Sequence, residues 1–377
     1  MSNIPSVDRK RDCRIDNIKG LLILCVVIGH LLELRLKVDS NRYLHVLIYL
    51  FHMPAFIFVT GYFAHFSMKK TVVSMVYPYL LFQFIYLLFA REVLHLKAAY
   101  QITTPYWIMW YLLAISVWSL SLYFFRAESR LAMLIEVGML VGIALMVGTI
   151  PGFSRFLSLS RIIVFFPFYM AGYYMRQYKN RDKSQDKSLN RSQDKSLNRS
   201  QDRSQDKSLN RGQDRSQDKS ECRSLNRRWN RNHVCVVIAS VLVLATLYYC
   251  SISYGFVDRN WLYEATGYAK SHYGMAFRGT HMLLAFACIF ALFTLMPECK
   301  IPVISKAGGK TLSIYLLHGF FVKVIGKYGL LKPLGRLPEM VETSIIVVMA
   351  LVIVVALSTK PVTDLLDIIL MRRKKKD

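Results

Sequence analysis

The chain has 377 residues, of which 54% are hydrophobic, and its formal net charge at pH 7 is +25. Its mean hydropathy is positive although a long polar segment lowers it, which excludes an ordinary soluble domain. Apolar runs with few charges recur from end to end, so the sequence predicts an all-α polytopic membrane protein.

The positive charge is distributed in clusters at alternate ends of the apolar runs, at residues 9–19, 69–70, 126–130, 176–231, 300–310 and 372–376. The positive-inside rule predicts this alternation for a chain that crosses a membrane many times. We therefore interpret the charge as a topology signal and as a contact for membrane lipid, and we reject nucleic acid as a partner.

About ten apolar runs are candidate transmembrane helices, at residues 18–34, 44–63, 72–89, 107–125, 131–150, 162–178, 234–253, 281–297, 312–325 and 344–357. The polar, basic start of the chain is followed by an apolar run without a small-residue cleavage site, so we expect this run to be retained as a span. With the basic clusters in the cytoplasm, an even number of spans places both termini there.

A polar repeat separates the sixth run from the seventh, because the octapeptide S-Q-D-K-S-L-N-R occurs at residues 184–191, 192–199 and 204–211. A segment of this composition cannot bury a core, so we expect it to be disordered. The chain then has three parts: a membrane domain with six spans at 1–178, a disordered cytoplasmic loop at 179–232, and a membrane domain with four spans at 233–377.

The first apolar run carries ionisable groups, with Lys19 at its start and His30 and Glu33 near its far end. Eleven helical steps separate Lys19 from His30, which is roughly 16 Å along the axis, so one side chain can lie at the membrane surface while the other is buried. His30 and Glu33 are three residues apart and share a helix face, where the carboxylate can orient the imidazole. Because polar groups in a membrane span are costly, we predict that this pair is catalytic.

Several familiar catalytic signatures are absent from the sequence. There is no G-x-S-x-G nucleophile elbow, no G-x-x-x-x-G-K phosphate loop, no H-E-x-x-H and no dinucleotide-binding fingerprint. None of the seven cysteines forms a C-x-x-C pair, so the sequence predicts neither a disulfide nor a metal site. Any chemistry must then come from the ionisable groups inside the spans.

Six motifs in order along the chain carry a family resemblance. The first is K-G-L-L-I-L-C-V-V-I-G-H at 19–30, in which a basic residue is followed after ten others by histidine. The others are F-H-M-P-A-F-I-F-V-T-G-Y-F at 51–63, V-Y-P-Y-L at 76–80, W-Y-L-L from 110, R-I-I-V-F-F-P-F-Y-M-A-G-Y at 161–173 and G-K-T-L-S-I-Y-L-L-H at 309–318. On these motifs the chain resembles the acyltransferase 3 family of membrane acyltransferases, and within it the sugar O-acetylases related to fucose 4-O-acetylase.

The resemblance implies transfer of an acyl group, usually acetyl, from cytoplasmic acyl-CoA to a hydroxyl of a cell-envelope glycan or its lipid-linked precursor. It also implies an enzyme of the bacterial cytoplasmic membrane, with acetyl-CoA as co-substrate, no tightly bound cofactor, a catalytic His30 and Lys19 at the family's paired basic position. On this interpretation Lys19 meets the CoA phosphates, and His30 acts as general base while Glu33 holds its tautomer. A transient acyl-histidine is the alternative route.

The chain departs from the family pattern before the third span, where Lys69 and Lys70 stand in place of the family's arginines. Lysine supplies charge but lacks the bidentate fork of arginine. We expect these two lysines to bind the CoA phosphates, and a role as topology determinants explains them equally well.

Five further polar residues in or near the spans are candidate contacts for the acceptor: His52, Arg161, Arg278, His281 and His318. Each also has a structural explanation, since a histidine can cap a helix end and an arginine can anchor a span at the membrane surface. His318 is the most informative of the later ones, because it lies in the middle of an apolar run.

Two other functions remain open at this stage. One is a transporter or flippase of a glycan or lipid, in which His30 and Glu33 relay protons. Transporters commonly have two similar halves, and the first five and last five runs show no such similarity. The other is a membrane scaffold whose basic insert recruits a polymerase. We favour the enzyme.

Overall fold

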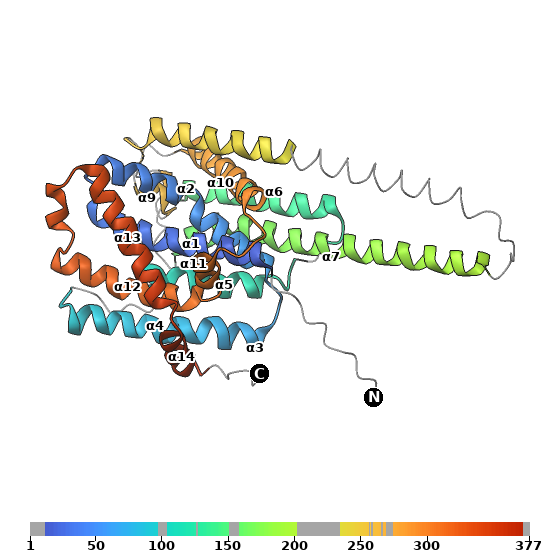
Figure 1. The fold of residues 1–377 in the computed structure, drawn as a ribbon, viewed down its shortest axis with the longest axis horizontal. Helices are drawn as coiled ribbons and strands as arrows, with labels where there is room; N and C mark the ends of the chain where they lie inside the picture. Colours follow the sequence, from blue (N-terminus) through green and yellow to red (C-terminus); the bar gives the residue numbers. More distant parts are fainter. Residues whose placement is uncertain are drawn as a thin grey trace.

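The chain folds into a bundle of α-helices, seen in the computed structural model of the protein in Figure 1. The structure describes residues 12–96, 104–125, 127–150, 158–201, 234–255, 257, 259–264, 267–268 and 274–371. Every regular element in these ranges is helical, which confirms the all-α prediction. The longer helices are α1 (Cys13–Leu32), α2 (Asp39–Tyr62), α4 (Tyr77–Leu88), α5 (Trp110–Ser121), α6 (Arg130–Met146), α7 (Leu159–Gln201), a helix at Val234–Ser253, α10 (Met275–Leu295), α12 (Thr311–Tyr328) and α13 (Glu339–Leu357).

Shorter elements join or continue these helices. The short α-helices are α3 (Met68–Thr71), α9 (Arg259–Leu262), α11 (Pro302–Gly308) and α14 (Lys360–Ile369). Turns of 3-10 helix lie at Glu33–Arg35, Trp107–Met109, Val147–Thr149 and Lys332–Arg336, and π-helical turns at Val72–Val76 and Phe89–Val93.

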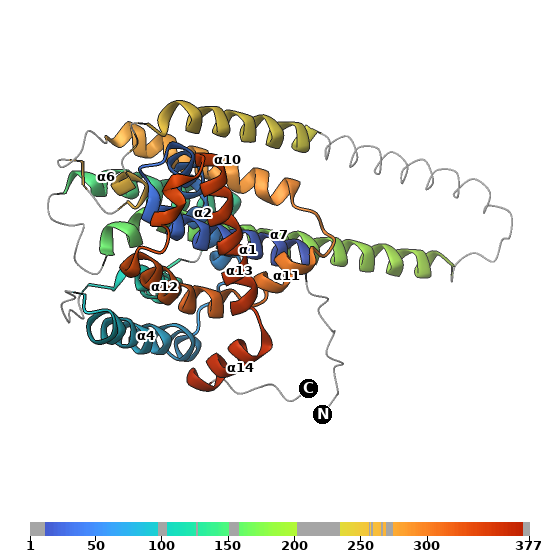
Figure 2. The ribbon, with the colours of Figure 1, turned by 60° about the vertical axis from the view of Figure 1, so that its left-hand side comes forward.

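Seven of the described helices, taken with the turns that continue them, are long and apolar enough to cross a membrane: Cys13–Arg35, Asp39–Tyr62, Met68–Val93, Arg130–Thr149, Val234–Ser253, Met275–Leu295 and Glu339–Leu357. A shorter apolar helix lies at Trp107–Ser121. The two remaining predicted spans fall on α7 and α12, which also belong to the bundle (Figures 1 and 2). The protein is therefore a polytopic helical membrane protein, while ten crossings and cytoplasmic termini stay predictions.

Helix α1 lies at the centre of the bundle, where it contacts α2, α11, α12 and α13. Apolar residues cover its whole circumference, as is typical of a helix buried on all sides. Those with no exposed surface are Ile18, Leu22, Ile23, Val27, Leu31 and Leu32. The backbone carbonyl of Ile304 occupies the place that a Cβ atom on Gly20 would need, so α1 and α11 pack with their backbones in contact.

Polar contacts hold both ends of α1. Near its start, Asn17 Nδ2 donates to the backbone carbonyls of Pro297 at 3.0 Å and Cys299 at 2.8 Å. Just after its end, Arg35 Nε donates to Glu342 Oε1 at 2.7 Å, and Nη2 donates to Oε2 at 3.1 Å. A bidentate pair of this kind fixes orientation as well as position. The polar side chains of α1 between these two ends, Lys19 and His30, are thus held on a helix that is fixed at both ends.

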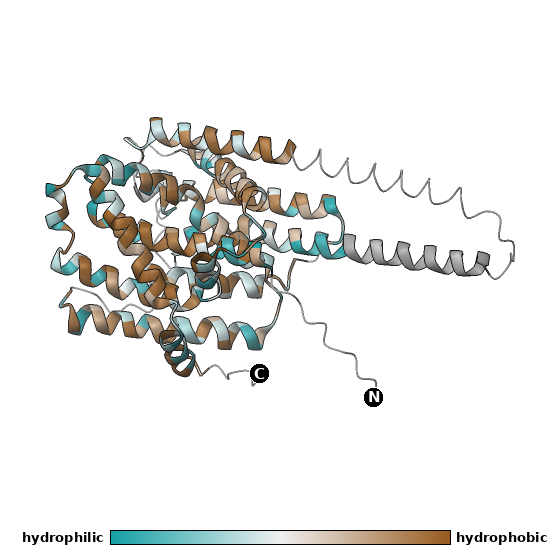
Figure 3. Cartoon of the chain, viewed as in Figure 1, coloured by the Kyte–Doolittle hydropathy of each residue, from teal (hydrophilic) through white to brown (hydrophobic). Residues whose placement is uncertain are grey.

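Large apolar side chains are exposed on the outer helices. Figure 3 shows the hydrophobic residues in brown along much of the bundle. They include Leu131, Leu134, Ile135 and Met139 on α6, and Val237, Val241 and Leu244 on the helix Val234–Ser253. A continuous apolar surface of this size is unfavourable in water. The hydrocarbon of a bilayer is the environment that matches it.

Helix α7 extends well beyond the other helices, as Figures 1 and 2 both show. It continues as far as Gln201 and so includes residues 179–201, the first part of the segment for which we expect a disordered loop. The repeat contains no glycine or proline in this part and supplies Gln, Lys, Leu and Arg, which favour a helix once one has been started. Residues 202–233, the rest of that segment, lie outside the described residues.

Candidate active site

His30 and Glu33 form a hydrogen-bonded pair at the end of α1. His30 lies in the last turn of α1 and Glu33 begins the 3-10 turn that follows, with 3.1 Å between His30 Nδ1 and Glu33 Oε1. An ionised carboxylate can only accept, so Nδ1 carries the hydrogen and Nε2 keeps its lone pair. The hydroxyl of Tyr49 on α2 donates to the same Glu33 oxygen and lies 3.2 Å from His30 Nδ1.

Two aromatic rings enclose the imidazole of His30. The ring centroid of Trp107 lies 4.7 Å from that of His30, and the ring of His318 on α12 stacks on it at 5.5 Å with 18° between the planes. His318 is fully buried, and its Nδ1 donates to the carbonyl of Ile314 at 2.9 Å. Its Nε2 has no hydrogen-bond partner among the described residues. Since buried polar atoms are nearly always paired, this acceptor is unusual.

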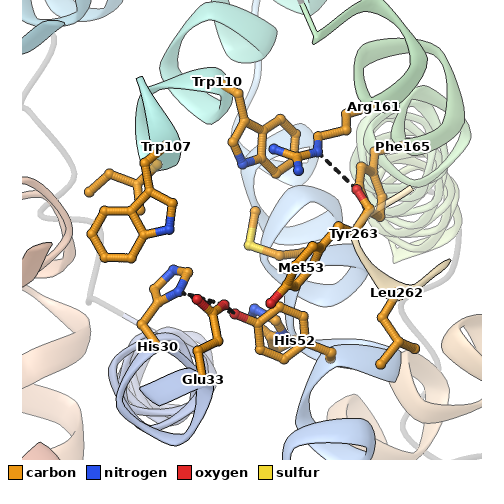
Figure 4. A pocket seen from close by; sticks show the side chains of 12 residues that line it. His30, Glu33, His52, Met53, Trp107, Trp110, Arg161, Phe165, Leu262 and Tyr263 are labelled. Carbon is orange, nitrogen blue, oxygen red and sulfur yellow. Dashed lines mark hydrogen bonds and ion pairs between the residues drawn. The ribbon is translucent and has the colours of Figure 1, made fainter. Parts of the chain in front are cut away.

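A cavity of about 100 Å³ opens beside His30 and is drawn in Figure 4. Five parts of the chain line it: the end of α1 with the turn after it, α2, the start of α5 with the turn before it, α7, and the end of α9 with the residue after it. The residues are His30, Glu33, Tyr49, His52, Met53, Trp107, Ile108, Trp110, Arg161, Phe165, Leu262 and Tyr263. Pockets for whole ligands measure roughly 300–1,000 Å³, so this space suits the reacting groups of two substrates and not an entire sugar.

Arg161 on α7 brings a positive charge to this cavity. Its Nε donates to the backbone carbonyl of Tyr263 at 2.9 Å, and its guanidinium lies 5.3 Å from the ring centroid of Trp110 (Figure 4). No carboxylate forms an ion pair with Arg161 in the described part of the chain. A guanidinium has five N–H donors, so the others remain for a bound group.

The structure brings together five of the residues predicted from the sequence. His30, Glu33, His52 and Arg161 line the cavity, and His318 lies directly behind His30. They come from four different helices. No group of three or more His, Cys, Asp or Glu among the described residues is arranged to hold a metal ion.

Arg278 and His281 on α10 lie outside this cavity and contact protein groups. Arg278 is fully buried, with Nε 2.8 Å from Glu264 Oε2 and an Nη1 donor 3.0 Å from the carbonyl of Ala144. His281 Nε2 lies 3.0 Å from the hydroxyl of Tyr249. These contacts hold α10 against its neighbours, which is a structural role for both residues. A role in acceptor binding stays a prediction that this arrangement does not favour.

Lys19, Lys69 and Lys70 lie toward the opposite end of the bundle from His30. Lys19 Nζ is 3.6 Å from Asp16 Oδ1 and 5.8 Å from the ring centroid of Phe63, the residue that caps α2. Lys69 and Lys70 on α3 follow soon after Phe63 and are exposed. The three lysines thus gather where α2 ends and α3 begins, and they can meet an anion from that side of the membrane.

Three residues near the site were not selected from the sequence: Tyr49, Trp107 and Lys323. Tyr49 lies three residues before His52 on one face of α2, and this spacing is a signal that the sequence offered. Trp107 begins an apolar run, a position where an aromatic residue is usually a membrane-interface anchor. Lys323 on α12 places its ammonium 4.3 Å from the ring centroid of Trp107, and a lysine within a predicted span was the signal missed.

Comparison with known proteins identifies the family of the chain. The nodulation protein NolL of Sinorhizobium fredii (strain NBRC 101917 / NGR234) is similar to this chain, with 35% identity over 80 residues. That alignment covers 18% of this chain and 22% of NolL, so the chain spans about a fifth of that relative. No solved structure matches. The acyltransferase 3 family, described as an acyltransferase domain, matches residues 14–359, from the start of α1 to the end of α13. The chain therefore belongs to the acyltransferase 3 family.

Proposed function

We propose that this protein transfers an acetyl or other short acyl group from cytoplasmic acyl-CoA to a sugar hydroxyl of a cell-envelope glycan or its lipid-linked precursor. The observation that carries the proposal is the His30–Glu33 pair, which leaves one imidazole nitrogen available inside a small cavity. Membership of an acyltransferase family supplies the reaction class.

His30 acts as the general base in this proposal. Because Glu33 accepts the Nδ1 hydrogen, Nε2 is free to take the proton of the acceptor hydroxyl as its oxygen attacks the thioester carbonyl. The carbon–oxygen bond forms, the carbon–sulfur bond breaks, and the proton on His30 passes to the leaving thiolate. A general base of this kind contributes about 10²–10⁴-fold to the rate.

The groups around His30 stabilise the charges that develop during this step. Glu33 offsets the positive charge on the imidazolium, and the face of Trp107 at 4.7 Å adds a cation–π contribution. The free N–H groups of Arg161 are suited to the negative charge on the thioester oxygen in the transition state.

The donor and the acceptor approach from opposite ends of α1. Lys19, Lys69 and Lys70 bind the phosphates of CoA at one end, and the thioester on its flexible arm extends roughly 16 Å along the helix to His30. The rings of Trp110 and Tyr263 provide apolar faces for the acceptor sugar. Because the proposed donor is cytoplasmic acyl-CoA, we also propose that the protein lies in the bacterial cytoplasmic membrane.

A transporter with a histidine proton relay uses the same buried imidazoles, and acyl transfer is favoured because the family match extends over most of the chain. The test compares cells with the intact gene, cells without it and cells that carry His30→Ala. Proton NMR of the purified envelope polysaccharide should show an O-acetyl signal only with the intact gene. His30→Ala should abolish the signal while the protein remains in the membrane fraction.

His95→Asn is the matched control, because His95 is exposed and its positive φ of 49° is one that asparagine tolerates. This variant should leave the O-acetyl signal unchanged. Retained acetylation in His30→Ala would remove His30 from the mechanism, and a polymer that is identical with and without the gene would contradict the proposed function.

A further inference from the structure

Helix α12 carries Lys323 in an otherwise apolar stretch on the same side of the bundle as His30. Its Nζ lies 4.3 Å from the ring centroid of Trp107 and 5.4 Å from that of Tyr106, and the side chain is partly buried. In the part of the chain that the structure describes, no acidic side chain lies within ion-pair distance of this ammonium. A lysine in a membrane span is costly unless it has a partner or a task.

Trp107 connects this ammonium to the candidate active site. The indole of Trp107 lies 4.7 Å from the imidazole of His30 and 4.3 Å from Lys323 Nζ, so it contacts both groups. An anion bound to Lys323 would therefore lie near the reacting groups and not at a remote part of the surface.

Lys323 adds a positive charge next to the cavity. Among the described residues that line the cavity, Arg161 and Glu33 carry one charge each, of opposite sign, and Lys323 lies outside this lining, against Trp107. Both His30 and Tyr49 bind Oε1 of Glu33, so this carboxylate is already used within the site. A site with an excess of positive charge is complementary to an anionic ligand.

We infer that Lys323 binds an anionic group of the acceptor, so that the acyl group goes to a glycan that carries a phosphate or a carboxylate close to the modified hydroxyl. This inference rests on the proposed function and specifies its substrate class. The rings of Trp107 and Tyr106 enclose the ammonium and leave it to face one oxyanion. The same oxyanion chemistry has two sources: the phosphate of a lipid-linked precursor, or an acidic group within the finished polymer.

The experiment uses the full-length protein in vesicles of phosphatidylcholine, which carry no net charge. The variants are Lys323→Gln, Lys323→Arg and Lys327→Gln. Lys327 is the matched control, because it lies four residues further along α12 and is exposed. Labelled acetyl-CoA is the donor. The acceptors are envelope glycans from cells without the gene, separated into a lipid-linked fraction, an acidic polymer fraction and a neutral polymer fraction.

The wild-type protein should acetylate the lipid-linked or the acidic fraction and not the neutral one, and the fraction used identifies the source of the oxyanion. Lys323→Gln should raise the KM for that acceptor about tenfold, because one ionic contact is lost, and should leave kcat within about twofold of the wild-type value. Lys323→Arg should restore the KM, and Lys327→Gln should not change it. Equal use of the neutral fraction, or an unchanged KM in Lys323→Gln, would overturn the inference.

A second measurement does not depend on turnover. An amine-reactive reagent is applied to the vesicles with and without inorganic pyrophosphate, and the labelled lysines are counted by mass spectrometry. Pyrophosphate should protect Lys323 and leave Lys327 fully labelled. Equal labelling of Lys323 in both samples would reject the anion site. If Lys323 is protected but no fraction is acetylated, the proposed function is at fault and the anion site stands.

Discussion

At the scale of single residues, the stacked imidazoles of His30 and His318 have different roles. His30 has one nitrogen bonded to Glu33 and the other available inside the cavity. His318 has one nitrogen bonded to the backbone of Ile314 and the other without a partner. A buried polar atom left unpaired costs about 1–3 kcal/mol of stability, so we interpret the second imidazole as functional. Its ring stacks on that of His30 with the centroids 5.5 Å apart, so we expect it to influence the charge that His30 acquires when it takes up a proton.

His318→Leu should separate these two effects. Removing the unpaired nitrogen should leave the thermal midpoint of the detergent-purified protein unchanged or slightly raised, while acetyl transfer falls at least about tenfold. His318→Gln keeps an acceptor atom at a similar distance from the backbone and should retain more activity than leucine. Full activity in His318→Leu would mean that His318 only fills space.

The His30–Glu33 pair could be predicted from residue spacing alone, because three positions on a helix place two side chains on one face. The environment of His30 could not. Trp107 and His318 approach it from segments far apart in the chain, and only the packed bundle shows that both rings meet the same imidazole. Arg278 is a second example, since its buried ion pair with Glu264 depends on how the segment after α9 folds back, which the sequence does not reveal.

At the scale of secondary-structure elements, the close packing of α1 against α11 positions the site. Gly20 on α1 faces the backbone of Ile304, and Gly308 on α11 faces the backbone of Asp16. Each glycine allows an approach that any side chain would block. The predicted spans agree with the helices because their apolar periodicity is local, whereas this contact between two backbones carries no sequence signal beyond the glycines themselves.

Gly20→Ala should therefore weaken the packing of α1 on α11. The added methyl group has to displace backbone, and overpacking of this kind costs about 1–3 kcal/mol, which should lower both the thermal midpoint and acetyl transfer. Gly138→Ala on α6 is the control, because nothing lies near the position of its Cβ atom and alanine favours a helix over glycine by about 0.5–1 kcal/mol. Thermal unfolding in detergent measures both variants. Equal midpoints in the two variants would contradict this account.

At the scale of the whole molecule, the described part of the repeat insert extends away from the bundle that holds the site. Helix α7 leaves the bundle and carries the first copies of the octapeptide away from it, as Figure 1 shows. Composition alone identifies the polar insertion in the sequence. It did not predict that helix would continue into the insertion, because a helix already formed in the bundle lengthens at little cost, and the sequence of the repeat does not reveal this.

Deletion of residues 182–227 should leave acyl transfer intact, because the insert contributes no residue to the described cavity and the cost of loop closure changes little with length. The O-acetyl content of the envelope polysaccharide, measured by proton NMR in cells that carry the shortened gene, gives the answer. Loss of acetylation from a protein that still reaches the membrane would favour the scaffold function, in which the insert recruits a partner.

The tight enclosure of His30 between Trp107 and His318 also bears on the barrier that the membrane provides. An enzyme of the proposed kind has to pass a thioester arm most of the way through the bilayer, and an open channel of that length would conduct ions and dissipate the proton gradient. In the proposed reaction, the rings of Trp107 and His318 pack against the imidazole where the thioester arm would end. They leave little room there for ions to pass, so that an acyl group can be exchanged while the membrane stays impermeable to ions.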